Sequence, residues 1–338
     1  MNVEYIKQEL NLLKGKTVAI VYIFEGDDSS GFEHFFIWKS NIISLWLNAV
    51  QDIKCRPFII DVRTFVDKAI NNTLPHIDFV INLNSGTLDL STMALVPSIC
   101  SSINVPCIPC DATTITAGEN KKLSNLIANS LGLNVPKNID NKNTNGIFRP
   151  INLGNSLGVK RSYNNTTKGI YQEFIEGYDI TTPIVYNVTE RKMDLLPTII
   201  YIPESCNTNW YNGDEAKKTR SGYSFKIVEP DITIKSKYLE LIDTLSINTF
   251  CRIDARVKSD SIDEDIDSID FDDTYFIEVN VMPTIREYNN FVHSYNAISP
   301  DSTYQKYFEA YKQVFEKTPN LNCFLLSSSM IALKPSTK

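Results

Sequence analysis

The amino-terminal third of the sequence alternates apolar runs with helical stretches. Residues 17–24, 56–62 and 79–83 are short apolar runs rich in β-branched residues, which is typical of buried strands. Residues 38–51 and 93–103 have apolar residues at helical spacing. Because strands joined through helices pair in parallel, this alternation predicts a parallel sheet covered by helices, and therefore an α/β fold.

The rest of the sequence divides into further units. With 338 residues, the chain is long enough for two or three domains. A helix is predicted at residues 121–131, ending at Gly132, and a last helix near residues 302–316 follows a region of strands and loops. The predicted domains are residues 1–110, 111–175 and 176–325, followed by a tail at 326–338.

Charge and hydropathy argue against two classes of partner. The net charge is −7, and no basic stripe with interleaved aromatic residues is present, so we expect no nucleic-acid partner. The apolar run at residues 17–24 is too short to span a membrane and lacks the flanking residues of a signal peptide. We therefore expect a cytoplasmic protein with no membrane partner.

The seven cysteines do not form a disulfide framework, because their number is odd and they are scattered along the chain. Cys107 and Cys110 have CxxC spacing, but no second pair or histidine cluster lies nearby to complete a zinc site. A redox motif would open a helix, whereas this pair ends a β-like run. We interpret both cysteines as structural.

Two predicted strands in the third domain carry polar residues in alternation. Glu278 and Asn280 lie in the apolar run at residues 276–280, and Arg252 and Asp254 lie in a second run upstream. Alternate residues share one face of a strand, so each pair would project from one face. Carboxylate and amide oxygens suit Mg²⁺ that nucleotide phosphates also hold, and an arginine suits the nearby negative charge. The alternative is the solvated face of an amphipathic hairpin.

A glycine-rich turn is the second polar feature. Arg149 stands at the end of a predicted strand, and Gly154, Ser156 and Gly158 follow it. Glycines and a short hydroxyl side chain let backbone N–H groups approach phosphate oxygens, and a nearby cation offsets their charge. The alternative is an ordinary β-turn. Neither a Walker P-loop nor a Rossmann fingerprint is present, so a nucleotide site here requires another architecture.

Taken in order, these motifs resemble the ATP-grasp superfamily and, within it, the D-alanine–D-alanine ligase family. The resemblance covers about residues 80–291 and rests on the order and spacing of the motifs. It implies a three-domain α/β architecture, in which an N-terminal parallel-sheet domain precedes two α+β domains that hold ATP between them. It also implies Mg²⁺ as one or two ions, which Mn²⁺ could replace.

The resemblance assigns roles to the matching residues. Lys121, Arg149 and Lys217 would bind the nucleotide phosphates, with Arg149 standing where the family has a lysine. Ser156 would act in the loop that closes over the phosphates, and Arg252 would stabilise the tetrahedral or phosphorylated species. The residues that would hold Mg²⁺ are Asp254, Glu278 and Asn280.

The segment at residues 171–179 resembles the family's hinge, which receives adenine. On this resemblance, Gln172 would face the adenine amino group, and Phe174 and Ile175 would cover the base. Asp179 would bind the ribose hydroxyls. The alternative for each residue is an ordinary edge strand that ends at a glycine turn.

The implied reaction is ATP-dependent formation of an amide bond. A substrate carboxylate attacks the γ-phosphate of ATP, and an amine then attacks the acyl phosphate to give an amide, ADP and phosphate. The expected substrates are amino acids or a small peptide, and the resemblance suggests a homodimer. The alternatives are an ATP-grasp ligase with a hydroxyl or thiol acceptor, and a non-catalytic nucleotide-binding regulatory protein.

The sequence departs from the family where the substrates bind. The family's His-Gly-Gly segment is replaced by residues 82–89, which contain no histidine or paired glycines, so D-alanine is not expected on both sides. The acidic run at residues 260–273 lacks the spacing of a calcium loop and is interpreted as a solvated hairpin loop. The candidate pocket residues are Glu25, Glu33, Asn84, Ser85 and Arg286.

Overall fold

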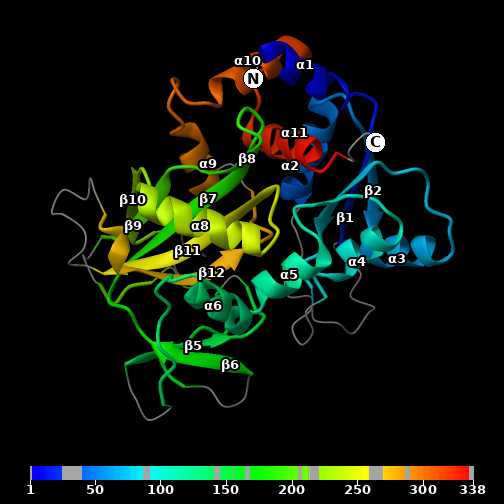
Figure 1. The fold of residues 1–338 in the computed structure, drawn as a ribbon. Coiled ribbons are helices and arrows are strands. Elements are labelled where there is room, and N and C mark those ends of the chain that lie inside the picture. Colours follow the sequence, from blue (N-terminus) through cyan, green and yellow to red (C-terminus); the bar gives the residue numbers. More distant parts are fainter. Residues whose placement is uncertain are drawn as a thin grey trace.

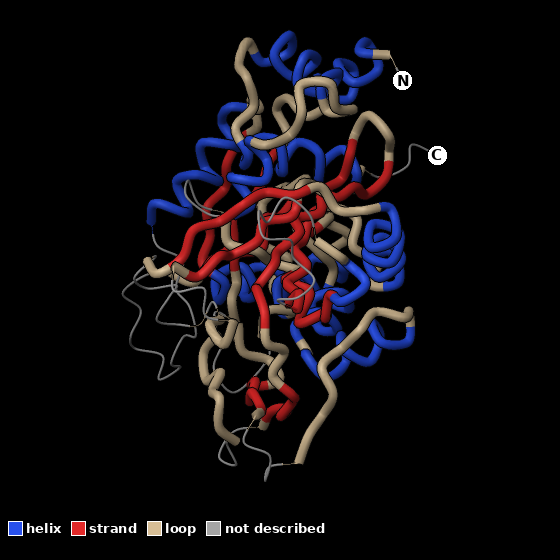
Figure 2. Tube along the Cα trace, turned by 90° about the vertical axis from the view of Figure 1, so that its left-hand side faces the viewer, coloured by secondary structure: helices blue, strands red, loops and turns tan. Residues whose placement is uncertain are grey.

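The chain has a mixed α/β fold, as the sequence predicts. The computed structural model describes residues 2–24, 40–86, 92–140, 145–154, 156–163, 168–204, 208–211, 213, 221–258, 269–285 and 290–334. Within these ranges the chain forms three β-sheets, and helices pack against the two larger ones (Figure 1). Figures 1 and 2 both show the smallest sheet set apart from the other two.

The amino-terminal sheet is parallel, which confirms the prediction from the alternating pattern. Its strands lie in the order β2-β1-β3-β4, and each neighbouring pair is parallel. On β1, Val18 and Ile20 belong to one buried cluster. Ala19 and Val21 belong to another, so both faces of the sheet are covered. The elements are α1 (Val3–Asn11), β1 (Thr17–Tyr22), α2 (Ser40–Asp52), β2 (Arg56–Asp61), α3 (Val62–Ile70), β3 (Phe79–Leu83), α4 (Leu95–Ser102) and β4 (Cys107–Ile108).

Two short helices lead from this sheet to a two-stranded antiparallel sheet. Asn120 ends the first helix and caps the second, because its side-chain oxygen accepts a hydrogen bond from Leu123 N at 3.0 Å. This junction fixes Lys121 in the first turn of the second helix. The elements are α5 (Ala112–Glu119), α6 (Lys121–Ser130), β5 (Gly146–Pro150) and β6 (Gly169–Glu173).

The largest sheet is antiparallel, with the order β10-β9-β7-β11-β12 and with β8 paired to β7. Helix α8 packs Ile234, Tyr238 and Leu241 into the core on one face of this sheet. The sequence predicts mostly strands and loops in this region and does not predict α8. The elements are β7 (Gly177–Asn187), β8 (Lys192–Leu195), β9 (Thr198–Pro203), β10 (Tyr223–Val228), α8 (Ile232–Thr244), β11 (Phe250–Lys258), a 3₁₀ turn at Phe271–Asp273 and β12 (Thr274–Asn280).

The last three helices return to the amino-terminal part of the chain. They are α9 (Asn290–Asn296), α10 (Gln305–Phe315) and α11 (Leu321–Ala332), and α10 matches the last helix that the sequence predicts. Figure 1 shows α10 beside α1 and α11 beside α2, in agreement with their contacts. The stretch expected to be a tail from residue 326 is therefore part of a helix as far as Ala332.

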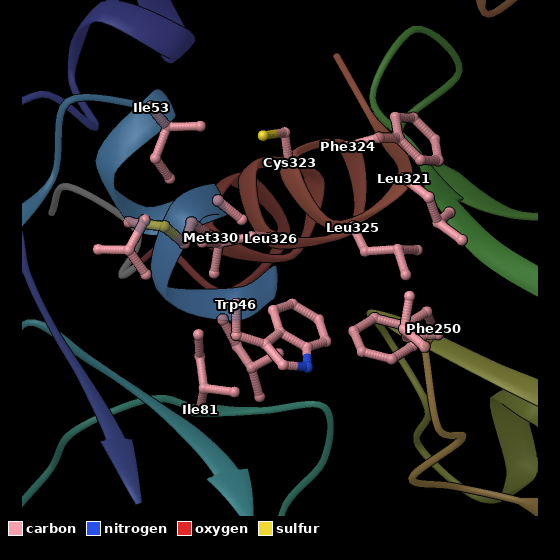
Figure 3. Packing of buried hydrophobic residues seen from close by; sticks show 14 of the residues in the cluster. Trp46, Ile53, Ile81, Phe250, Leu321, Cys323, Phe324, Leu325, Leu326 and Met330 are labelled. Atoms are coloured by element: carbon pink, nitrogen blue, oxygen red, sulfur yellow. The ribbon is translucent and has the colours of Figure 1, made fainter. Parts of the chain in front are cut away.

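Helix α11 is the centre of a core that joins distant parts of the chain. Its residues from Leu321 to Met330 are all buried. Figure 3 shows this helix beside Trp46 of α2 and Phe250 of β11, whose rings stack with centroids 6.2 Å apart. The same cluster includes Val185 of β7. A continuous core therefore holds the large sheet against the amino-terminal sheet and its helices.

Candidate functional site

Strands β11 and β12 bring the predicted polar residues onto one face. In their antiparallel register, Arg252 lies opposite Asn280 and Asp254 lies opposite Glu278. The intervening Ile253 belongs to the core on the other face of the sheet. The four polar residues therefore share one face of the sheet.

A β-bulge in this strand pair adds a further group. The register shifts between Asp254 and Ala255, so Ile277 is an extra residue on β12. Ile277 and its neighbour Glu278 both line a cavity on the polar face. The carbonyl of Ile277 accepts a hydrogen bond from Arg149 Nη1 at 2.8 Å. The bulge thus supplies a backbone acceptor for a cation of the neighbouring small sheet.

Arg252 and Asp254 form a bidentate ion pair. Arg252 Nε donates to Asp254 Oδ1 at 2.7 Å, and Arg252 Nη2 donates to Asp254 Oδ2 at 2.9 Å. The hydroxyl of Thr181, on β7, also donates to Asp254 Oδ1 at 2.6 Å. Burial acts to lower the pKa of Arg252, but the charge and hydrogen bonds of Asp254 raise it above its ordinary value. The guanidinium therefore remains charged.

Lys121 reaches the same face from the first turn of α6. Its ammonium donates to Leu153 O at 2.7 Å and pairs with Glu278 Oε2 at 3.2 Å. The Lys121 side chain is only 6% exposed, so protein atoms rather than water hold its charge. Since Leu153 precedes the glycine turn, this one cation links the turn to β12.

Arg149 and Gln172 form a buried network in the lining of a cavity on the polar face. Arg149 Nη2 donates to Gln172 Oε1 at 2.5 Å, and Gln172 Nε2 donates to Pro136 O at 2.8 Å. The Asn125 amide satisfies its hydrogen bonds when its oxygen accepts from Arg149 and Gln172, each at 3.2 Å. Both ends of the Gln172 amide are thus engaged within the protein, whereas the family resemblance implies that this amide faces adenine.

Burial perturbs the ionisation of Arg149. The pKa of its guanidinium is lowered to about 10, chiefly by burial, although the charge of Glu278 acts in the opposite direction. Arg149 still carries its charge at neutral pH, because about 10 lies well above 7. The structure therefore holds a desolvated cation next to the cavity.

Arg256 fastens the hinge segment to β11. Arg256 lies on the same face of β11 as Arg252 and Asp254, and it is only 4% exposed. Its guanidinium pairs with Asp179 at 2.6 Å and donates to the carbonyls of Ile175 and Gly177, each at 2.8 Å. Its Cζ lies 4.7 Å from the ring centroid of Phe174. One side chain thus holds the segment that the sequence analysis assigns to adenine.

Gly177 allows the hinge to approach β11 closely. Its φ is +148°, and a Cβ at this position would lie 2.0 Å from the carbonyl oxygen of Val257. Any side chain would clash with the backbone of the neighbouring strand. A glycine is therefore required at position 177, where β7 begins.

The cavity encloses about 920 Å³, including its mouth open to solvent. This size and its mixture of apolar walls with a few charged groups are typical of a small-molecule site. Most of the residues predicted from the sequence line it. They are Lys121, Arg149, Ser156, Gln172, Phe174, Ile175, Asp179, Arg252, Asp254 and Glu278.

Some predicted residues are not placed in the cavity. Asn280 shares the polar face but does not line the cavity, and its side-chain oxygen accepts a hydrogen bond from Met282 N at 3.2 Å. The Asn84 amide is engaged by its own loop, because it donates to Thr92 O at 2.6 Å. The predicted residues outside the described part of the chain are Lys217, Glu25, Glu33 and Arg286, together with most of the acidic run at 260–273.

Other cavity residues are absent from the sequence analysis. Thr181, Tyr201, Tyr211 and Arg256 also line the cavity. Arg256 could have been found, because it follows Asp254 by two residues on one strand. Thr181 and Tyr201 lie on β7 and β9, and local spacing does not reveal which strands become neighbours. Burial raises the pKa of Tyr201, so its hydroxyl stays protonated at neutral pH.

Asp254 and Glu278 offer two carboxylates to a metal on this face. In the part of the chain that the structure describes, no group of three or more His, Cys, Asp or Glu side chains could hold a metal ion. An ion here would therefore need further oxygens from Asn280, nucleotide phosphates and water, which is usual for Mg²⁺. The donor set fits an ion that binds together with a nucleotide.

The cysteines of the CxxC pair are buried within the core. Neither Cys107 nor Cys110 forms a disulfide bond. Burial raises the pKa of each thiol well above its ordinary value, so neither has thiolate character. These properties favour the structural interpretation.

No helix in the described residues is long and apolar enough to cross a lipid bilayer.

Comparison with solved structures identifies the architecture. VanG D-Ala:D-Ser ligase from Enterococcus faecalis matches with a TM-score of 0.57 and 14% identity, covering 89% of this chain and 100% of its own. D-Alanine–D-alanine ligase from Bacillus anthracis complexed with ATP matches with a TM-score of 0.58 and 16% identity, covering 90% and 99%. The same Bacillus anthracis ligase, in another structure, gives 0.58 and 15%, covering 89% and 99%. No family model and no curated protein matches the sequence. The chain therefore has an ATP-grasp fold resembling that of D-alanine–D-alanine ligases, which confirms the predicted fold.

Proposed function

We propose that the protein is an ATP-dependent ligase that joins a carboxylate to an amine. The observation that carries this proposal is that the cations Lys121, Arg149 and Arg252 line the same cavity as the carboxylates of Asp254 and Glu278. Such a set can balance the charge of a triphosphate during phosphoryl transfer. The ATP-grasp fold, shared with a ligase structure that contains ATP, supports this assignment.

In this proposal the nucleotide lies along the cavity between the small and the large sheet. Lys121 and Arg149 face the phosphates, because both are buried cations that line the cavity. Phe174 and Ile175 cover the base, and Asp179 binds the ribose. Gln172 positions Arg149 in this proposal and does not face the adenine amino group, since its amide oxygen accepts a hydrogen bond from the Arg149 guanidinium.

Asp254 and Glu278 would hold Mg²⁺ or Mn²⁺, with the amide oxygen of Asn280 as a further ligand. When bound, the metal would neutralise phosphate charge as a Lewis acid. Each carboxylate is already paired with a cation, since Asp254 contacts Arg252 and Glu278 contacts Lys121. The charges of the two proposed metal ligands are therefore balanced by Arg252 and Lys121.

The proposed reaction proceeds through an acyl phosphate. Arg252 stabilises the negative charge that develops as the substrate carboxylate takes the γ-phosphoryl group and as an amine then attacks. Ser156, in the glycine turn that lines the cavity, contributes to excluding water from this intermediate. Amino acids or a small peptide are the proposed substrates, and D-alanine on both sides is not proposed.

Phosphate release from Mg-ATP tests the proposal. The purified protein is assayed against a panel of amino acids and small carboxylic acids, each with and without an amine. We expect release that depends on both co-substrates, and we expect Glu278→Gln to lower kcat/KM at least ~100-fold, because a metal-binding carboxylate is lost. Glu240→Gln is the matched control, since Glu240 is exposed on α8.

The panel also separates the alternatives. Release that depends on a hydroxyl or thiol compound instead of an amine would indicate the other ligase class. Binding of Mg-ATP without release under any condition would indicate a nucleotide-binding regulatory protein. Full activity in Glu278→Gln would rule out the proposed metal-binding role.

A further inference from the structure

We infer that Arg256 is a positioning residue for the nucleotide sugar, an inference that rests on the proposed function of the cavity. Arg256 lies directly opposite Asp179 in the β7–β11 register. Its Nη1 donates to Asp179 Oδ1 at 2.6 Å, a short charge-assisted hydrogen bond. Since Asp179 lines the cavity where we place the ribose, Arg256 sets the orientation of that carboxylate.

The other donors of Arg256 go to backbone carbonyls. Nε donates to Ile175 O at 2.8 Å, and Nη2 donates to Gly177 O at 2.8 Å. Nη2 also lies within hydrogen-bond distance of Thr208 O at 3.2 Å and Trp210 O at 3.1 Å. These carbonyls belong to the hinge segment at residues 171–179 and to the connection between β9 and β10. One guanidinium therefore joins the ribose carboxylate, the base-binding hinge and the adjoining connection.

The planar fork of arginine is needed for this arrangement. Its five N–H donors point in fixed directions, so one side chain can satisfy acceptors on two segments at once. Lysine would keep the charge, but its single ammonium cannot reach all of these acceptors. Arg256→Lys should therefore leave the Asp179 carboxylate with a cation nearby but without a fixed orientation.

A role in stability alone does not account for the position of Arg256. Burying a cation costs folding free energy, and apolar replacements of buried ion pairs often leave stability unchanged or higher. Arg256 is 4% exposed, and both Arg256 and Asp179 line the cavity. The geometry points to a pair that is built to present Asp179 to a ligand.

Sugar discrimination tests the inference separately from stability. Binding of Mg-ATP and of Mg-2′,3′-dideoxy-ATP is measured by titration calorimetry, without carboxylate or amine, for the wild type and three variants. The variants are Arg256→Lys, Asp179→Asn and the double substitution. Lys258→Met is the matched control, because Lys258 lies two residues further along β11 with a side chain 40% exposed.

We expect the wild type to prefer ATP over the dideoxy nucleotide. Arg256→Lys should weaken ATP binding about tenfold and affect the dideoxy nucleotide much less, because a charged hydrogen-bond network at the sugar is lost. In the Asp179→Asn background, Arg256→Lys should cause little further loss of discrimination, whereas Lys258→Met should behave as the wild type.

Two results would overturn the inference while the proposed function stands. The first is wild-type sugar preference in Arg256→Lys, whatever its melting temperature. The second is wild-type sugar preference in Asp179→Asn, which also decides the matter if Arg256→Lys does not fold. A wild-type protein that binds neither nucleotide would instead refute the proposed function, and the inference with it.

Discussion

Replacing Arg149 would separate its cost to folding from its contribution to nucleotide binding. Burial is the chief cause that lowers the pKa of this guanidinium from its ordinary value to about 10. Such a lowering corresponds to a cost of ~3 kcal/mol in the free energy of folding. Because the folded pKa lies below the unfolded one, the cost is present in full at neutral pH and is relieved only above pH of about 10.

Arg149→Met removes this cost but also removes three hydrogen bonds, to Ile277 O, Gln172 Oε1 and the Asn125 oxygen. Gln172 Oε1 is left unpaired, at ~1–3 kcal/mol for a buried acceptor, whereas Ile277 O and the Asn125 oxygen each keep another donor at 3.2 Å. The two contributions oppose each other, so we expect the free energy of unfolding to fall by no more than ~3 kcal/mol. Mg-ATP affinity should fall by a factor of ~10–100, since a charged hydrogen bond is worth ~1.5–3 kcal/mol.

Urea unfolding and titration calorimetry with Mg-ATP measure the two effects. Lys122→Met is the control, because Lys122 is an exposed cation next to Lys121, and it should change the unfolding free energy by less than ~0.5 kcal/mol. A loss of ~5 kcal/mol or more with unchanged ATP affinity would show that Arg149 is a structural cation. That result would refute the reasoning.

Two further changes test the core and one ion pair. Phe324→Ala should lower the free energy of unfolding by ~3–5 kcal/mol in urea titrations, whereas Ile232→Ala, at an 80% exposed position, should change it by less than ~0.5 kcal/mol. Equal losses would contradict the buried placement of α11. Burial acts to raise the pKa of Asp78, but hydrogen bonds from Lys16 and Thr17 hold this pKa below 3.8. The ionised carboxylate therefore stabilises the folded protein above pH 3.8, and this contribution is lost as the pH falls through the lower pKa of the folded state. Asp78→Asn should therefore lower the melting temperature near neutral pH, and the difference from the wild type should shrink as the pH falls below 3.8. A difference that is unchanged by acidification would count against this ion pair.

Strand alternation predicts part of the site well. Arg252 with Asp254, and Glu278 with Asn280, needed only the two-residue period of a strand to be placed on one face. The bulge at Ile277 could not be predicted, because one inserted residue leaves no mark in an apolar run. It nevertheless decides which β12 backbone oxygen meets a buried cation.

Helices were predicted where their apolar residues keep to one side. Helix α8 also has this spacing, at Ile234, Tyr238 and Leu241, and it follows the capping residue Asp231. It is not predicted, because the segments on both sides of it read as strands. Helix α11 is apolar on nearly all sides and carries no periodic signal, because it is enclosed from every direction. The Arg149–Gln172 contact joins neighbouring strands of one small sheet, and sequence spacing does not show that the two polar ends would satisfy each other.

Helix α11 also has a consequence for the order in which the chain is made. The strands of the amino-terminal sheet leave the ribosome early, but the cluster that holds Val18, Ile20 and Trp46 is completed by residues of α11. At ~5–20 residues per second, that helix emerges on the order of 10–40 s after the sheet. During this interval the cluster contains residues of α1 and α2 but lacks the buried residues that α11 contributes. We therefore expect newly made protein to depend on chaperone cover until translation reaches α11.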